Sequence, residues 1–180
     1  MSGTGTVSGV SIFFDTEFTQ FREGELLSVG LVTDGDDELV VEIHDPGRFA
    51  RANDFCRDVV IPQFGSSPAH RVRTDAELGA VVASWLMRLG GPLTLLYDYK
   101  LDWRFLEAAL ASGALWPELA PRVSIFNVAD VASSEACLAA QDAYFASQSW
   151  PGRHHPLVDA KALRERWRAY LRTSAKGVMG

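Results

Sequence analysis

The carboxylates Asp15 and Glu17 are the residues whose type and spacing best suit chemistry. They follow the apolar run 12–14, Ile-Phe-Phe, whose β-branched and aromatic side chains are typical of a buried strand. Buried charges are costly unless they are paired or bound to metal. Because side chains alternate along a strand, both carboxylates can share one face at its end, and two such oxygen ligands suit Mg²⁺ or Mn²⁺. A polar strand end without metal is the simpler alternative for this pair alone.

Two further acids extend the pattern, each at the edge of an apolar segment. Asp102 lies near the start of an expected helix, and Asp159 lies in the first turn of the last expected helix, with His154 five residues earlier. An acid in the first turn of a helix often serves only to complement the helix dipole. The order of the three groups along the chain nevertheless favours one shared site.

Hydrophobic patterning predicts an α/β domain that positions these groups. Apolar runs at 10–15, 26–32 and 38–44, separated by turn signals, predict a three-stranded antiparallel meander. Runs at 93–97 and 123–126 predict two more strands, which gives a five-stranded mixed sheet flanked by helices. We expect helices at 49–59, 74–89, 102–110, 128–140 and 156–172. The second of them begins with the pattern of a capping box, with Thr74 as N-cap and Glu77 three residues on. Residues 1–9 are expected to form a flexible tail, and 10–180 a single domain.

The three motifs resemble those of a known nuclease family. They are Phe-Asp-Thr-Glu-Phe at 14–18, Tyr-Asp-Tyr-Lys-Leu-Asp-Trp-Arg-Phe-Leu at 97–106, and His-His-Pro-Leu-Val-Asp-Ala at 154–160. These segments are similar to the Asp-x-Glu, central Asp and His-x-x-x-x-Asp motifs of the DEDDh (DnaQ-like) 3′–5′ exonucleases. The resemblance covers about residues 10–172 and implies a ribonuclease H-like fold.

The resemblance also implies a mechanism. Carried over to this chain, the metal ligands are Asp15, Glu17, Asp102 and Asp159, and the general base is His154. Two divalent ions, Mg²⁺ or Mn²⁺, assist the hydrolysis of phosphodiester bonds at single-stranded 3′ ends, with release of 5′-mononucleotides. A histidine of near-neutral pKa can take the proton of the attacking water. We expect Asp15 to bridge the ions, Glu17 and Asp159 to complete one site, and Asp102 to reach the other through water.

Within the family, the chain is most similar to small bacterial exoribonucleases of the poly(A)-specific ribonuclease AS type. Segments 15–18, 25–30 and 157–160 carry this similarity, and ribonuclease T and oligoribonuclease are more distant. The relatives imply an RNA substrate and a homodimer. A 3′–5′ DNA exonuclease of the proofreading or repair type, which uses the same residues, is the first alternative. A catalytically silent nucleic-acid-binding domain is the second.

The sequence departs from the family pattern at two positions. Asp98 stands where many relatives have asparagine, and this extra acid either binds water on a metal or caps a turn. His155 follows His154, and it is either the N-cap of the last helix or a solvent-facing neighbour.

Four residues are candidates for substrate contact. Phe18 can stack on the terminal base or pack in the core. Leu26 or Leu27 can wedge beside that base, although we expect at least one of them in the core. Lys100 is a candidate phosphate contact, and plain surface charge is the alternative.

Charge is unevenly distributed along the 180 residues, whose formal net charge is −6. This net negative charge argues against broad, non-specific binding to nucleic acid. Residues 1–60 hold twelve acids against four basic residues. Seven basic residues lie between position 153 and the end: Arg153, Lys161, Arg164, Arg166, Arg168, Arg172 and Lys176. A basic C-terminal segment near acidic metal ligands is compatible with a phosphate-bearing substrate, and a solvated basic helix face is the alternative.

The remaining composition favours a cytoplasmic protein without membrane association. No apolar stretch is long enough to span a bilayer, and the first residues carry no export-type pattern. The two cysteines, Cys56 and Cys137, are widely spaced, which predicts free thiols rather than a metal-binding pair.

Overall fold

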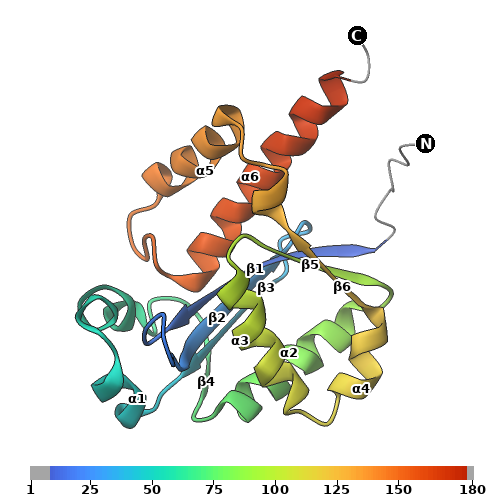
Figure 1. Ribbon diagram of the computed structural model, residues 1–180. Helices are drawn as coiled ribbons and strands as arrows, with labels where there is room; N and C mark the ends of the chain where they lie inside the picture. Colours follow the sequence, from blue (N-terminus) through green and yellow to red (C-terminus); the bar gives the residue numbers. More distant parts are fainter. Residues whose placement is uncertain (1–8, 178–180) are drawn as a thin grey trace.

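Strand β1 (Val10–Phe18) lies inside the sheet of the computed structural model, which describes residues 9–177 (Figure 1). It pairs antiparallel with β2 (Leu26–Thr33), which pairs antiparallel with β3 (Glu38–Ile43). The predicted meander is therefore confirmed, with β1 extending to Phe18 rather than ending at residue 15. The tail predicted at 1–9 falls, up to residue 8, outside the described residues.

The sheet has six strands rather than the predicted five. On the other side of β1, β5 (Leu93–Tyr97) and β6 (Val123–Asn127) add in parallel at the two later apolar runs. The additional strand, β4 (His70–Val72), pairs in parallel with the outer edge of β3. It has only three residues, which is too few for an alternating pattern to distinguish it from a loop.

Helices cover both faces of the sheet (Figure 1). One face carries α2 (Asp75–Leu89), α3 (Lys100–Ala111) and α4 (Trp116–Leu119), and the other carries α6 (Pro156–Gly177) with α5 (Glu135–Ser147) packed on it. Alternation along β1 sends Ile12 and Phe14 into the core beneath α2 and α3, and Phe13 into the core beneath α6. None of the helices in the described range is long and apolar enough to cross a membrane.

The helix predicted at 49–59 is replaced by short pieces. The chain forms α1 (Pro46–Arg51), a single π-helical turn η1 (Cys56–Val60) and a 3₁₀ turn η2 (Ile61–Gln63). Pro62 limits the extension of the helical segment because it lacks a backbone N–H. Cys56 and Cys137 are free, buried thiols, as predicted.

The helix predicted at 128–140 starts later than its pattern indicated. Asn127 caps only the 3₁₀ turn η4 (Val128–Asp130), where its side chain accepts a hydrogen bond from the Ala129 amide. The carbonyl of Ala132 accepts a hydrogen bond from the Arg166 guanidinium at 2.7 Å. This carbonyl is therefore engaged with α6, and α5 begins only at Glu135. A further 3₁₀ turn, η3 (Ala120–Arg122), precedes β6.

Gly30 lets α6 approach the sheet directly beside Asp15. It lies opposite Asp15 in the β1–β2 register. A β-carbon at Gly30 would lie only 2.3 Å from the backbone nitrogen of Leu157, in the first turn of α6. The missing side chain therefore allows the start of α6 to pack against the strand end that carries Asp15.

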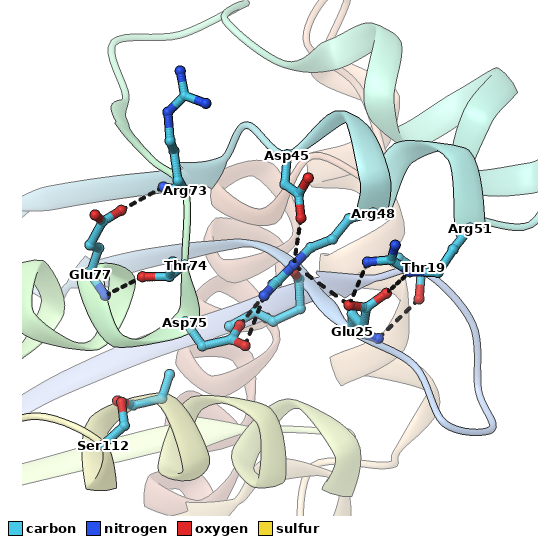
Figure 2. Close-up of polar contacts among 12 residues, drawn as sticks. Thr19, Glu25, Asp45, Arg48, Arg51, Arg73, Thr74, Asp75, Glu77 and Ser112 are labelled. Atoms are coloured by element: carbon cyan, nitrogen blue, oxygen red, sulfur yellow. Dashed lines mark hydrogen bonds and ion pairs between the residues drawn. The ribbon is translucent and has the colours of Figure 1, made fainter.

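A buried arginine ties three elements together beneath the β1–β2 loop (Figure 2). Arg48 of α1 donates to both carboxylate oxygens of Asp75, at 2.8 and 2.9 Å, and to the carbonyl of Leu26 at 2.6 Å. Arg51 forms a second bidentate pair with Glu25, at 2.7 and 2.9 Å. These contacts join α1, the start of α2 and the base of the loop.

The start of α2 is capped much as the sequence predicted. Thr74 is the N-cap, and its hydroxyl accepts a hydrogen bond from the Glu77 amide at 3.2 Å (Figure 2). The Glu77 carboxylate reaches back to the Arg73 amide at 2.7 Å, one residue before the N-cap position. Thr74 is therefore confirmed as the N-cap, whereas the Glu77 carboxylate accepts a hydrogen bond from the Arg73 amide and not from the Thr74 amide.

We expect Arg48→Met to lower the free energy of unfolding by about 2 kcal/mol, because it removes charge-assisted hydrogen bonds made by a buried group. Chemical denaturation with urea measures this change. Arg51→Met is the matched control, because its pair with Glu25 is largely exposed and should matter less. Equal effects of the two substitutions would show that the buried network has no special role in stability.

Candidate active site

The carboxyl ends of β1 and β5 meet at one edge of the sheet, where α3 and α6 also begin. The two strands are parallel neighbours, so polar residues that follow them lie close together. The predicted catalytic residues all line one cavity of about 190 Å³ at this edge: Asp15, Glu17, Asp102, His154 and Asp159. The fold thus brings together residues from β1, α3, α6 and the loop before α6.

The side chains that could bind a metal ion form two groups. Within each group, the potential ligand atoms all lie within 4.8 Å of one another. One group contains Glu17, Asp159 and His154, which matches the expected first metal site with the histidine beside it. The other contains Asp15, Asp102 and Asp98. Asp98 is therefore a fifth carboxylate of the centre.

Asp102 is fixed next to β1 by a buried hydrogen bond. The hydroxyl of Thr16, between the two carboxylates of β1, donates to Oδ1 of Asp102 at 2.7 Å. Thr16 was not singled out from the sequence. A hydroxyl residue between the two carboxylates of the Asp-x-Glu motif was the only sign in the sequence. Its partner, Asp102, lies 86 positions later in the chain.

The carboxylates of Asp15 and Glu17 lie close together, and no residue that the structure describes donates a hydrogen bond to either of them. Glu17 is only 8% exposed. Burial, followed by repulsion from the neighbouring carboxylates, raises the pKa of both groups well above the ordinary range. Such groups lack the compensation that buried charges require. A divalent cation would supply it, so the donor set fits bound metal.

Asp102 and Asp159 are also difficult to ionise in the metal-free protein. Burial raises the pKa of each to about 7, and it outweighs the hydrogen bonds from Thr16 and from the His154 amide that act in the opposite direction. Asp98 adds repulsion to both groups. The whole cluster therefore retains protons at pH values where an isolated aspartate has lost them.

His154 adopts a left-handed backbone conformation with φ of +68°. Its amide points between the two oxygens of Asp159, each at 3.2 Å, which offsets the cost of this uncommon conformation. Its ring packs edge-on against Phe55 with the centroids 4.9 Å apart. Burial and the nearby Arg153 lower the pKa of the imidazole. His154 is therefore held in a neutral, proton-accepting state at the mouth of the cavity.

His155 has a separate, structural role. Its carbonyl accepts the first hydrogen bond of α6, from the Asp159 amide at 3.0 Å, and its side chain is buried. Of the two roles considered from sequence, the N-cap position is correct and the solvent-facing position is wrong.

Aromatic side chains surround the opening of the cavity. Phe21, Phe55 and Tyr99 line it and are 70%, 48% and 47% exposed. Phe18 lies deeper in the lining and stacks on Phe105 with a centroid separation of 5.0 Å. Phe18 therefore both packs against α3 and reaches the cavity, whereas the three exposed rings were not singled out from sequence.

The other predicted substrate contacts lie elsewhere. Leu26 and Leu27 are buried in two separate parts of the core, so we do not retain them as base contacts. Both are apolar residues of β2, whose side chains are buried on both faces of the sheet. Lys100 is exposed at the start of α3 and is not among the residues that line the cavity.

The basic residues of α6 are largely engaged with acids. Three of them pair around the turn between β2 and β3: Lys161 with Glu38 at 2.6 Å, Arg164 with Asp36 at 2.7 Å, and Arg168 with Asp34 at 3.7 Å. These pairs attach α6 to the sheet, so they are not a free surface for phosphate. The side chain of Lys176 lies outside the part of the chain that is described.

In the absence of divalent ions, we expect stability to fall as the pH rises from about 4 to about 7. The folded chain keeps protons on Asp102 and Asp159, whose pKa is about 7, after the unfolded chain has lost them near the ordinary value of 3.8. The associated stability is present below the unfolded pKa and lost as the pH passes the folded one. Thermal unfolding in EDTA at pH 5 and pH 8 measures this loss. Mg²⁺ should restore the midpoint mainly at pH 8, because protons compete with metal.

Asp15→Asn sharpens this test, because it removes a crowded charge at nearly constant shape. In EDTA at pH 8, the variant should unfold at a higher temperature than the parent protein, and it should lose the rise produced by Mg²⁺. Glu107→Gln removes an exposed charge of α3 outside the cluster and should change neither result. A lower midpoint for Asp15→Asn in EDTA would contradict the assigned repulsion.

Comparison with known proteins adds no assignment to this geometry. Neither a scan against protein-family models nor a search of curated proteins finds a match to the chain. The placement of the side chains, together with the three motifs that resemble those of the DEDDh exonucleases, therefore carries the functional argument.

Proposed function

We propose that this protein is a metal-dependent 3′–5′ exoribonuclease of the DEDDh type with a ribonuclease H-like fold. It hydrolyses phosphodiester bonds at single-stranded 3′ ends and releases 5′-mononucleotides. The observation that carries the proposal is the convergence of the five motif residues around one cavity. The meander β1–β3, extended beyond β1 by two parallel strands, supports the expected fold.

The donor atoms fit two divalent cations, Mg²⁺ or Mn²⁺, which prefer carboxylate oxygens. Glu17 and Asp159 would hold one ion, and Asp15 and Asp102 the other. Asp15 is also near enough to Glu17 and Asp159 for their charges to raise its pKa. When bound, the two ions would supply stabilisation of the charge that develops on the phosphoryl oxygens and the leaving 3′-oxygen.

His154 supplies the proton acceptor. Its imidazole is neutral at pH 7 because burial and Arg153 lower its pKa, so a ring nitrogen can take the proton of the attacking water. The paired hydrogen bonds of its amide to Asp159 place the ring beside one of the two acidic groups. The edge-on contact with Phe55 limits its rotation.

The aromatic opening suits the end of a single strand. Exposed rings offer stacking surfaces for bases, and such stacking tolerates different sequences. The cavity of about 190 Å³ is smaller than most sites that enclose a whole small molecule, which are roughly 300–1,000 Å³. A cavity of this size fits the terminal unit of a longer strand whose remainder lies outside.

The test is a turnover assay on end-labelled single strands of oligo(A), mixed RNA and DNA. We expect mononucleotides to be released from the 3′ end of RNA in Mg²⁺ or Mn²⁺, and no release in EDTA. His154→Ala should lower kcat by about 100- to 10,000-fold, the usual contribution of a general base. Asp15→Asn should abolish release. His70→Ala, an exposed histidine of β4, is the control and should retain activity.

The same assay contains the outcomes that would overturn the proposal. Release that survives in EDTA or in Asp15→Asn would exclude the assigned centre, and cleavage of a closed circular RNA would exclude an end-dependent enzyme. Preference for DNA would favour the alternative DNA exonuclease. Binding without cleavage would favour the silent nucleic-acid-binding domain.

Phe21→Ala should raise KM more than it lowers kcat, whereas Trp150→Ala, an exposed ring at another cavity, should not.

Assembly and location are part of the same proposal. The resemblance implies a homodimer that acts on single-stranded RNA, and the composition favours the cytoplasm. Light scattering at micromolar concentration decides between a dimer and a monomer of 19.7 kDa.

A further inference from the structure

Asp98 is the carboxylate of the centre to which the reaction outlined above assigns no role. It follows β5 directly, and its ligand oxygen lies within 4.8 Å of those of Asp15 and Asp102. It also lines a second cavity, of about 140 Å³, which shares Asp15, His154 and Asp159 with the first. The acidic centre thus opens on two sides, and Asp98 faces the second.

A buried arginine forms an ion pair with Asp98. Nη1 of Arg166 donates to Oδ2 of Asp98 at 3.3 Å, and Nε of Arg166 is anchored on the carbonyl of Ala132 at 2.7 Å. The side chain of Arg166 is buried, so this direction of approach is fixed by packing. The side chain of Gln141, which also lines the second cavity, is a further hydrogen-bond partner of Asp98.

The contacts do not support capping of the neighbouring helix as the role of Asp98. The N-cap residue of α3 is Tyr99, whose side chain makes no cap hydrogen bond, so Asp98 does not occupy the cap position. Of the two uses considered from sequence, the contacts favour the one at the metal centre, and the structure adds an ion pair with Arg166.

The charges favour a role beyond the ion pair. When ionised, Asp15, Asp98 and Asp102 carry three negative charges, and Arg166 offsets one of them, which leaves two for a divalent cation. Glu17 and Asp159 carry two more beside a neutral His154. Glu17, which is buried without a donor among the described residues, indicates independently that this centre takes a cationic ligand.

We propose that Asp98 is a direct ligand of the second divalent cation, together with Asp15 and Asp102. The cation lies on the side of the second cavity. This inference rests on the proposed function and makes the acidic centre a set of five carboxylates, in which Arg166 is only an ion-pair partner of the fifth.

The experiment counts bound Mn²⁺ by isothermal titration and follows the magnetic coupling of neighbouring Mn²⁺ ions by electron paramagnetic resonance. The unsubstituted chain should bind two ions with a coupled spectrum. Asp98→Asn, which is nearly isosteric, should keep the first ion, weaken the second by at least about tenfold and lose the coupled signal. Asp130→Asn removes an exposed acid near the end of β6 and is the matched control; it should bind as the parent does.

Arg166→Gln tests whether Asp98 binds the cation itself or serves only as the ion-pair partner of Arg166. If Asp98 binds the cation directly, this variant keeps two ions and the coupled spectrum, because the ligand remains and a repelling charge is gone. Loss of the second ion in Arg166→Gln as well as in Asp98→Asn would overturn the inference, as would two ions of unchanged affinity in Asp98→Asn. A parent chain that binds no Mn²⁺ would overturn the proposed function too, whereas two ions in both the parent and Asp98→Asn would leave that function standing.

Discussion

Mutual repulsion among five carboxylates at one edge of the sheet is the constraint on which the site depends. Burial removes the water that would screen these charges, and it is the first cause of the raised pKa of Asp15, Glu17, Asp102 and Asp159. Side chains under such repulsion move apart unless the surrounding structure holds them. The elements around the site therefore have to prevent this separation.

Each wall of the candidate site is held by a contact outside the carboxylate cluster. Gly30 allows the first turn of α6 to lie against β2, opposite Asp15. The ion pairs of α6 with the turn between β2 and β3 keep that helix on the sheet. The hydroxyl of Thr16 fixes Asp102 beside β1. Arg48 secures the base of the loop that carries Phe21. The basic character of α6 thus serves its attachment, with Arg166 directed at the acidic centre itself.

Features that depend on local patterns were predictable from sequence. The meander, the later strands and the Thr74 cap all follow from alternation, apolar runs and turn residues over a few positions. The five motif residues were found because their types and order carry chemistry. The three-residue strand β4 was missed because no period can be recognised in so short a segment.

Features that depend on distant partners were not predictable. Asp98 was left with two alternatives because its position relative to Asp15 and Arg166 is decided only when β5 and α6 pack. Leu26 and Leu27 lie beside a loop in sequence, but sheet packing buries both. The charges of α6 suggested phosphate binding because their acidic partners lie more than 100 positions earlier in the chain.

The most direct measurement is anomalous diffraction from crystals grown with Mn²⁺. The account predicts two anomalous peaks within one acidic centre, one beside Glu17 and Asp159 and the other beside Asp15 and Asp102, with a separation of roughly 3.5–4 Å. Crystals in which Mn²⁺ is found elsewhere, or in which the five carboxylates stay metal-free at saturating Mn²⁺ and pH 8, would contradict the claim that this cluster is a two-metal centre.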